Sequence, residues 1–495
     1  MVNISYSIRF HGIREPDRVA LSYLGHSVTY KELWKRIQRM AAYLVEAGIE
    51  EGDVVAVLMK NSSAFIEIAF AVSYVGAIFL PINYRLATDE VNYICSDSSA
   101  KLLFADIELY DEDISCNSVL LDTKTQLNTS CLVSNYHPVA TRPRSTDELF
   151  RLMYTSGTTS RPKGVMHSYR NFHWKCMDQS IALNLNNNNR LLIAGPLYHV
   201  GAFDLPGIGV LLRGGMLAIM REFDTKACLS LIQSEKLNCA WLAPVMTSSL
   251  LSFTENQNFD LTSMNWIIGG GERTPEKRIH EFSSLFKNAR YIDAYGLTES
   301  CGGDTFMDPG REFEKIGSVG RPTPHVEVQI RDKKGNILDP GVEGEICLRG
   351  PKIFDGYWQD PEKTQNSFYK DVFRTGDAGY LDSEGFLFLT DRIKDMIISG
   401  GENISSQEVE RVIIEMPQIS EVAVFGVKDP KWGEIPVAAI VYTDGKSIDL
   451  DSLKAHCIKN LASFKVPKDF LIKKRLPRNP SGKVLKRLLR QEYNI

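Results

Sequence analysis

The sequence lacks the features that mark several specialised classes of protein. Its 57 Lys plus Arg and 61 Asp plus Glu leave a net charge of only −4, so no global field attracts it to nucleic acid or anionic lipid. Its most apolar stretch, residues 64–80, is too short to span a membrane comfortably and contains Glu67 and Gly76. The first residues show no basic segment followed by an apolar one, so we expect no secretory signal.

The cysteines do not form a pattern typical of disulfides or of a zinc site. All nine are scattered, their number is odd, and none belongs to a C-x-x-C pair. This pattern indicates reduced thiols and predicts a cytoplasmic protein. The chain is 43% hydrophobic and 24% charged, which is typical of soluble globular proteins. Its 495 residues predict at least two domains.

The first part of the chain alternates between helical and strand-like patterns. A capping box at Thr29–Glu32 starts a helix, and a strand follows over 54–58. A helix near 63–75 and a strand near 78–81 repeat this order. Such alternation predicts largely parallel sheets covered by helices, and the fold class is therefore α/β.

The pattern changes after about Val326. Short alternating strands with Gly and Asp turns predict antiparallel structure in a small β-barrel-like region. Beyond Asp391 the pattern is that of a second, smaller α+β domain of about a hundred residues. We therefore expect a large N-terminal domain over 1–390 and a small C-terminal domain over 391–495.

The most informative segment is YTSGTTSRPKG, residues 154–164. Five hydroxyl-bearing residues flank Gly157 and precede Lys163. Small hydroxyl side chains and exposed backbone N–H groups suit phosphate oxygens, and the lysine adds a positive charge. The spacing of a Walker A loop is absent, so the segment predicts another kind of phosphate-binding loop.

Seven motifs in order make the chain resemble the adenylate-forming superfamily of acyl-CoA synthetases, peptide-synthetase adenylation domains and firefly luciferase. They cover essentially the whole chain: YTSGTTSRPKG, PLYH (196–199), GGGE (269–272), DAYGLTE (293–299), RTGD (374–377), DRIKDMI (391–397) and NPSGK (479–483). Ser160 is a departure, because the family more often has glycine there. The resemblance implies an ATP-dependent enzyme whose small C-terminal domain is mobile.

The resemblance also implies an ATP site around these motifs. Tyr295 can stack on a purine, Asp293 can accept from an exocyclic amine, and Glu299 can bind magnesium through a hard oxygen ligand. Asp377 suits two ribose hydroxyls, and Arg392 can reach the sugar or the phosphates. Without the resemblance, Tyr295 would be interpreted as a core residue, and the acids and Arg392 as ordinary charged residues of turns and the surface. The full set of expected nucleotide and coenzyme contacts is Thr155, Ser156, Gly157, Thr158, Thr159, Lys163, Gly271, Glu272, Arg273, Asp293, Ala294, Tyr295, Gly296, Asp377, Arg392, Gly400 and Gly401.

The expected catalytic residues are Lys483, Thr298, Glu299 and His199. Lys483 matches the lysine that the family needs for adenylation, where a cation neutralises charge as a carboxylate attacks the α-phosphorus. Asp391 matches the hinge about which the small domain rotates, so that Gly400 and Gly401 admit the thiol. Eight of the eighteen residues over 473–490 are Lys or Arg, which is also compatible with a solvated basic tail that makes weak membrane contact.

The acid pocket is less well defined by the sequence. Its candidate lining residues are His199, Gly201, Phe203, Asp204, Trp241, Gly270, Leu297 and Cys301. His199 resembles the family's gating aromatic position, although a lone histidine is more often structural. Asp204 is either a partner for a substrate amine or a solvated or helix-capping acid. Val200 stands where amino-acid-activating relatives have an aspartate, which argues against an ordinary α-amino acid.

We therefore expect an AMP-forming acyl-CoA synthetase, a ligase that makes acyl-AMP and pyrophosphate from an acid and ATP and then transfers the acyl group to coenzyme A. The expected acid is fatty or otherwise hydrophobic, including aryl acids. The alternative is a free-standing adenylation enzyme that loads an amino or aryl acid onto the pantetheine of an acyl-carrier protein. ATP, Mg²⁺ and coenzyme A, as a co-substrate, are the expected cofactors. We expect no nucleic-acid partner and at most weak peripheral membrane contact.

Overall fold

The computed structural model describes residues 3–124, 137, 139–155, 162–255, 258–270, 276–393, 395–399, 402–478 and 484–493. The chain divides into two compact units. The first comprises Met1–Val328 and Leu348–Phe373, and the second comprises Gln329–Cys347 and Arg374–Ile495. The sequence predicted a domain boundary between residues 390 and 391, whereas this division assigns 374–390 to the second unit. The boundary at 391 stays a prediction.

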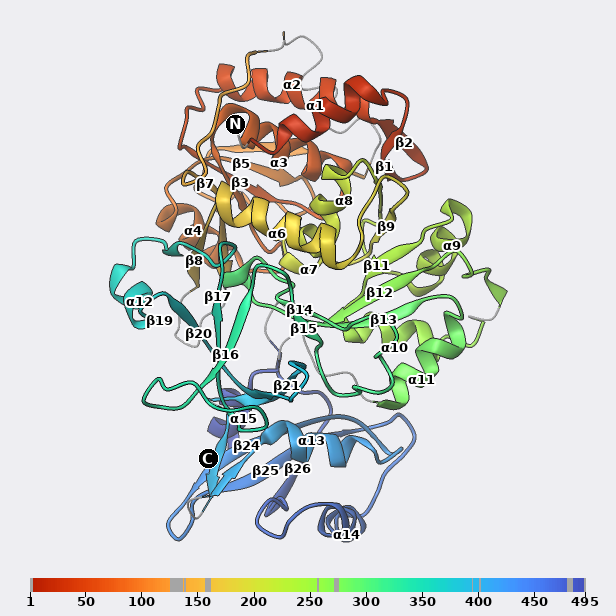
Figure 1. Ribbon diagram of the computed structural model, residues 1–495, viewed down its shortest axis with the longest axis vertical. Helices are drawn as coiled ribbons and strands as arrows, with labels where there is room; N and C mark the ends of the chain where they lie inside the picture. The colour runs from red at the N-terminus through yellow and green to blue at the C-terminus, as the bar shows by residue number, and fades with distance from the viewer. Residues whose placement is uncertain are drawn as a thin grey trace. The chain divides into compact units, whose positions relative to one another are not determined.

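The larger sheet of the first unit has nine strands in the order β15-β14-β13-β12-β11-β9-β10-β1-β2 (Figure 1). Its six inner strands, from β13 to β1, pair in parallel, as the alternation of helices and strands predicted. Leu229, Ile267 and Phe282 belong to its buried core. The strands are β1 (Val19–Tyr23), β2 (His26–Thr29), β9 (Arg190–Ile193), β10 (Met216–Ile219), β11 (Cys239–Trp241), β12 (Trp266–Gly270), β13 (Arg290–Tyr295), β14 (Thr305–Phe306) and β15 (Arg321–Pro322).

The smaller sheet of the first unit has seven strands in the order β18-β8-β7-β4-β3-β5-β6. Its strands from β7 to β6 pair in parallel, whereas β8 runs antiparallel to both β7 and β18. The strands are β3 (Val54–Leu58), β4 (Ile78–Pro81), β5 (Ala100–Asp106), β6 (Ser118–Leu121), β7 (Leu149–Thr155), β8 (Lys163–Ser168) and β18 (Gly356–Tyr357). The predicted phosphate-binding loop connects β7 to β8.

Helices cover both sheets of the first unit, and Figure 1 shows α1 to α3 beside β3 and β5, and α9 to α11 beside β11 to β13. The capping box predicted at Thr29 is confirmed, since Thr29 and Glu32 exchange hydrogen bonds between side chain and backbone. None of the described helices has the length and apolar character that a membrane crossing needs. The helices are α1 (Ser5–Arg14), α2 (Tyr30–Glu46), α3 (Ser63–Val75), α4 (Thr88–Asp97), α6 (Tyr169–Ala182), α7 (Val200–Ala202), η1 (Phe203–Gly207), α8 (Ile208–Leu212), α9 (Thr225–Glu235), α10 (Pro244–Ser252), α11 (Glu276–Leu285), η3 (Thr298–Ser300) and α12 (Pro361–Asn366).

Helix α3 explains the most apolar stretch of the sequence. All thirteen of its residues are buried, including Glu67, whose carboxylate accepts from Arg36 at 3.0 Å. The helix ends at Gly76, which adopts the left-handed φ of +78° that glycine tolerates best. The prediction of a buried helix followed by a strand is therefore confirmed.

The second unit contains two sheets. The region predicted as antiparallel and barrel-like forms a sheet of β16 (Glu327–Arg331), β17 (Gly344–Arg349) and β20 (Val372–Leu381), with β21 (Leu387–Arg392) antiparallel to β20. The short strand β19 (Phe368–Tyr369) belongs to the first unit and pairs antiparallel with Val372 and Phe373 at the start of β20. The other sheet has the order β23-β22-β25-β24, with β26 parallel to β25. Its core includes Val412, Ile440 and Leu453. Its elements are β22 (Ile397–Ser399), β23 (Glu402–Ile404), α13 (Ser406–Ile414), β24 (Ile419–Asp429), β25 (Gly433–Tyr442), α14 (Leu450–Asn460), β26 (Asp469–Lys473) and α15 (Lys486–Tyr493).

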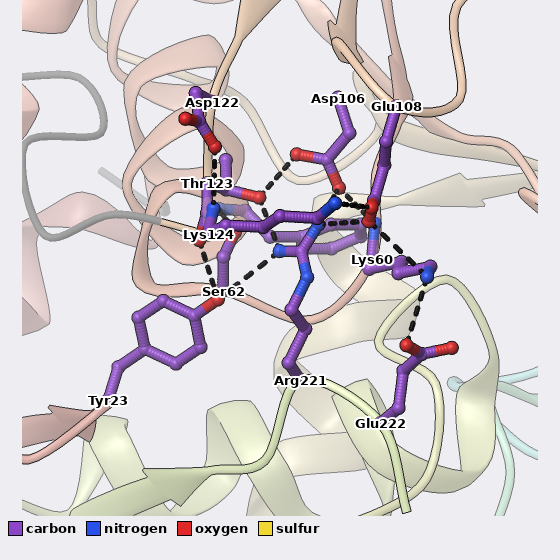
Figure 2. A network of polar contacts seen from close by, with 11 residues as sticks. Tyr23, Lys60, Ser62, Asp106, Glu108, Asp122, Thr123, Lys124, Arg221 and Glu222 are labelled. Atoms are coloured by element: carbon purple, nitrogen blue, oxygen red, sulfur yellow. Dashed lines mark hydrogen bonds and ion pairs between the residues drawn. The ribbon is translucent and has the colours of Figure 1, made fainter.

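Charged residues near the carboxyl ends of strands from both sheets of the first unit form one polar network (Figure 2). Arg221, after β10, donates to Asp106 at 3.1 Å and to Glu108 at 2.5 Å, and both acids lie at or just after the end of β5. Lys60, after β3, pairs with Glu108 at 3.3 Å. Burial opposes ionisation of Glu108, but hydrogen bonds from Lys124, Arg221 and Lys60 lower its pKa to about 2. The network ties the two sheets together.

Candidate active site

Three parallel strands bring predicted residues to one edge of the nine-stranded sheet. Strands β11, β12 and β13 end at Trp241, Gly270 and Tyr295, and Gly270 lies opposite Ala294 in the register. Asp293 and Tyr295 are both buried here. In open α/β sheets, ligands bind outside the carboxyl ends of parallel strands. The structure therefore collects five of the predicted contacts at the edge where a ligand is expected.

A buried ion pair fixes the loop that follows β13. Asp304 and Lys352 are both fully buried, and Asp304 Oδ1 lies 2.9 Å from Lys352 Nζ. The same ammonium donates to two backbone carbonyls of the loop at 3.2 and 2.6 Å. Burial raises the pKa of Asp304, whereas the charge of Lys352 lowers it. Sequence reasoning missed this pair because no motif relates two residues so far apart in the chain.

Glu299, the predicted magnesium ligand, lies on η3 beside Lys163. Lys163 Nζ is 3.8 Å from Glu299 Oε1 and 3.8 Å from the centre of the Tyr357 ring. The Tyr357 hydroxyl donates to the same carboxylate oxygen at 2.9 Å. Burial lowers the pKa of Lys163, and the charge of Glu299 raises it. Tyr357 was not predicted, since only the pairing of β18 with β8 brings it here.

The residues of this cluster fit a magnesium–nucleotide complex. Thr155 ends β7, and its Oγ1 is buried with no hydrogen-bond partner among the described residues. A buried hydroxyl without a protein partner, at the start of the predicted loop, suits a phosphate oxygen. Within the described ranges there is no group of three or more His, Cys, Asp or Glu that could hold a metal. A single carboxylate such as that of Glu299 suits a magnesium ion that takes its other ligands from phosphates and water.

A chain of buried polar contacts leads from η3 into the core. His167 Nε2 lies 2.7 Å from the carbonyl oxygen of Thr298, and His167 Nδ1 accepts from Arg151 Nε at 3.1 Å. Burial and the charge of Arg151 lower the pKa of His167 to about 3, so a neutral imidazole donates from Nε2. Arg151 in turn pairs with Asp204 at 2.8 Å, and Lys175 Nζ lies 3.3 Å from the same carboxylate.

Asp204 therefore has neither of the roles that the sequence suggested. Its side chain is fully buried, and its carboxylate faces two cations of the protein itself. Burial would raise the pKa of Asp204, but the charges of Arg151 and Lys175 hold it below its usual value. Both the contact with a substrate amine and the solvated or capping acid are wrong. No sequence pattern indicates this triad of Arg151, Lys175 and Asp204, because Arg151 and Asp204 are 53 residues apart.

The segment after β9 carries further candidates for the acid pocket. His199 caps α7, since its Nδ1 accepts from the backbone N–H of Gly201 at 3.1 Å. Phe203 is only 1% exposed and packs against the rings of Phe65 and Phe79. Phe203 thus packs in the core, and its assignment to the pocket lining stays a prediction. The substrate role of His199 stays a prediction.

The loop after β13 faces this segment. A Cβ built on Gly302 would lie 3.6 Å from Val200 Cβ, so the two segments are in contact. On the loop, Gly296 is exposed, Leu297 is partly buried and Cys301 is fully buried. Burial raises the pKa of the Cys301 thiol to about 12, so this cysteine is not a nucleophile at neutral pH.

The described residues of the second unit include three of the predicted ones. Asp377 on β20 pairs with Arg392 on β21, with Oδ1 and Nε 3.2 Å apart. Asp391 is buried and accepts from the N–H and hydroxyl of Ser406, the first residue of α13, at 2.5 and 3.2 Å. Burial raises the pKa of Asp391, whereas the charge of Lys486 lowers it. Asp391 thus ties β21 to α13, and its role as a hinge stays a prediction.

Several predicted residues lie outside the described residues. They are Ser156, Gly157, Thr158, Thr159, Gly271, Glu272, Arg273, Gly400, Gly401 and Lys483. Their assignments depend on the resemblance alone and stay predictions.

Comparisons with known proteins match the whole chain. A family model described as "AMP-binding enzyme" matches residues 11–358, and one described as "AMP-binding enzyme C-terminal domain" matches residues 408–483. The chain is 34% identical to a feruloyl-CoA synthase of Amycolatopsis sp, over 97% of the chain and 96% of that protein. It is 36% identical to a long-chain-fatty-acid–CoA ligase of Mycobacterium tuberculosis, over 100% and 99% respectively.

Solved structures give the same result for the fold. The o-succinylbenzoate CoA synthetase of Bacillus subtilis in complex with its acyl-adenylate intermediate has a TM-score of 0.90 and 30% identity, covering 98% of this chain and 97% of that one. The same enzyme in complex with ATP and magnesium has a TM-score of 0.89 and 29% identity, covering 99% of both chains.

Proposed function

Because the chain belongs to the AMP-binding enzyme family, we propose that it is an ATP-dependent ligase that joins a carboxylic acid to coenzyme A. In the first step a carboxylate oxygen attacks the α-phosphorus of ATP, and pyrophosphate leaves. In the second step the coenzyme A sulfur attacks the acyl carbon, AMP leaves, and the thiol proton passes to solvent. Both steps need positioning and charge stabilisation, and neither needs a covalent acyl-enzyme.

The observation that carries the proposal is the cluster of Lys163, Glu299 and Tyr357 beside the unpartnered hydroxyl of Thr155. Lys163 offers a positive charge to phosphate oxygens, and its contact with the Tyr357 ring keeps it in place. Tyr357 donates to one oxygen of Glu299 and so fixes the direction of the carboxylate. A magnesium ion held by Glu299 would neutralise charge on the phosphates.

The remaining roles follow from place and chemistry. Asp293 and Tyr295, at the carboxyl edge of the large sheet, are assigned to the adenine. Asp377, oriented by Arg392, is assigned to the ribose hydroxyls. Lys483 is assigned to the charge that develops during adenylation, on the strength of its motif.

A hydrophobic or aryl acid and the thiol of coenzyme A are the proposed substrates, because the curated relatives carry names of CoA ligases for such acids. A carrier-protein pantetheine is the alternative acceptor. We place the enzyme in the cytoplasm, because all eight described cysteines are free. The basic segment over 473–490 is assigned at most a weak peripheral contact with membranes.

The test is release of pyrophosphate and AMP by the purified protein with ATP and Mg²⁺ across fatty, aryl and amino acids, with and without coenzyme A. AMP release that needs both one acid and coenzyme A is the expected result. Acid-dependent pyrophosphate release that coenzyme A does not change would favour a carrier-protein acceptor. No release with any acid would contradict the proposal.

Two lysine variants make the test specific to the site. Lys163→Met removes the cation beside Glu299 and is expected to lower the rate of adenylation by about 10²-fold or more. Lys226 is an exposed lysine of α9 that pairs with Glu255 at 3.8 Å. Lys226→Met removes this lysine and should leave the rate unchanged. Equal rates in the two variants would contradict the role of Lys163.

A further inference from the structure

Trp241 occupies a slot formed by two glycines. A Cβ built on Gly195 would lie 2.4 Å from Trp241 Cζ3, and a Cβ on Gly201 would lie 2.4 Å from Cζ2. Real Cβ atoms do not approach other atoms so closely, so no larger residue fits either position while the indole is present. Neither glycine has a left-handed φ, so the backbone conformation does not require glycine there. The indole ring is the reason for both glycines.

The slot lies among residues that the sequence assigned to the acid pocket, which include His199, Gly201 and Trp241. Gly195 and Gly201 flank the turn that carries His199, and Asn61 holds this turn by donating to the Gly195 carbonyl and accepting from the Leu197 N–H, both at 2.8 Å. Trp241 is the last residue of β11, and this strand pairs with β9 and β12. These hydrogen bonds and the sheet pairing hold the backbone on both sides of the ring in place.

The indole also lies where an acid is expected. Gly201 is adjacent to Val200, which touches the loop after β13 at Gly302. Trp241 itself ends a parallel strand at the edge where ligands bind. Trp241 retains 9% exposure, so a small part of the residue is accessible.

We propose that Trp241 determines specificity by closing the acid pocket, so that the enzyme accepts short or flat aryl acids and rejects long unbranched ones. The inference rests on the proposed function and deepens it by naming the substrate class. An extended alkyl chain would need the space that the ring fills, whereas an aryl group can lie against the ring face. Trp241 acts by shape, and it takes no part in either chemical step.

The test is kcat/KM for coenzyme A-dependent AMP formation over unbranched saturated acids of increasing length and over aryl acids. The wild type is expected to turn over aryl and short acids and to lose activity steeply beyond a limiting length. Trp241→Ala should raise kcat/KM for the next longer acids about 10-fold or more, because each added methylene in an apolar pocket changes discrimination by about that factor. Trp241→Phe, with a smaller ring, should lie between the two.

A compensating pair keeps the test independent of loss of folding. Gly201→Ala alone brings a Cβ into the ring and should lower kcat/KM for all acids. In the Trp241→Ala background the same Cβ has room, so the double variant should be more active than Gly201→Ala. Restored activity would show that ring and glycine share one space.

The outcomes separate the inference from the proposed function. A wild type that forms no AMP with any acid would overturn both. A wild type with acid-dependent turnover whose length profile is unchanged in Trp241→Ala and Trp241→Phe would overturn the inference alone. A wild type that prefers long unbranched acids would also overturn it.

Discussion

Replacing Asp204 by asparagine should destabilise the first unit by about 3–5 kcal/mol, the usual cost of removing one partner from a buried ion pair. The carboxylate is fully buried and is the only anion within 4 Å of both Arg151 and Lys175 among the described ion pairs. With Asp204 present, this triad carries one excess positive charge, because His167 is neutral. Without it, two buried cations would face each other with no counter-charge.

Replacing each of the three residues Lys175, Arg151 and Asp204 should therefore lower the free energy of unfolding by increasing amounts, in that order. Lys175→Met leaves the closer Arg151–Asp204 pair intact and should change the free energy of unfolding by about 1 kcal/mol. Arg151→Met leaves the longer Lys175–Asp204 contact of 3.3 Å and removes the donor to His167, so its cost should be intermediate. Asp204→Asn should cost most.

Urea unfolding of the intact chain at pH 7, monitored by tryptophan fluorescence, measures the free energy of unfolding of each variant. Calorimetry provides a second measurement of the same order. Glu255→Gln is the control, because its ion pair with Lys226 is exposed and should contribute less than about 1 kcal/mol. Asp204→Asn within error of wild type, or Lys175→Met more costly than Asp204→Asn, would refute the reasoning. The pKa of Asp204 is lower in the folded protein than in the unfolded chain. The ionised carboxylate therefore stabilises the fold fully above the unfolded pKa of about 3.9, and this contribution is lost as the pH falls through the lower folded pKa.

Three further predictions concern the loop, the network of Figure 2 and the C-terminal lysine. Lys352→Met leaves Asp304 buried without its cation and should lower both the melting temperature and the rate of pyrophosphate release; an unchanged rate would mean that the loop does not position η3. Glu108→Gln should reduce the loss of stability that the wild type shows between about pH 4 and pH 2 in acid titrations, because a lowered pKa stabilises the fold only above that range; parallel titration curves would contradict this. Lys483→Ala should abolish adenylation yet leave thiolysis of a supplied acyl-adenylate largely intact, and equal loss of both half-reactions would rule out its assignment.

Local signals predicted a large part of the fold. The capping box at Thr29 and the apolar helix over 63–75 depend on neighbours within a few residues, and the structure confirms both. The family and the fold class are also confirmed, because seven motifs along the chain carried them.

Long-range contacts account for what the sequence did not predict. Asp204 was misjudged because its charge partners come from β7 and α6, and no periodicity links them to η1. Tyr357 was missed because a two-residue strand gives no pattern. The contact of Trp241 with Gly195 and Gly201 was not predicted, because these residues lie far apart in the sequence. Trp241 and Gly201 were nevertheless both assigned to the pocket.

The strand order of the large sheet has a consequence for the chain during its synthesis. Strand β1 pairs with β2 on one side and with β10 on the other, and β10 lies roughly 190 residues later in the sequence. At translation rates of about 5–20 residues per second, β1 waits roughly 10–40 s for its parallel neighbour. During that interval the nascent chain presents an unpaired apolar strand edge to the solvent, which is the kind of surface that chaperones bind and that aggregation begins from. Synonymous codon changes that slow translation before residue 216 would extend this exposure without changing the finished protein.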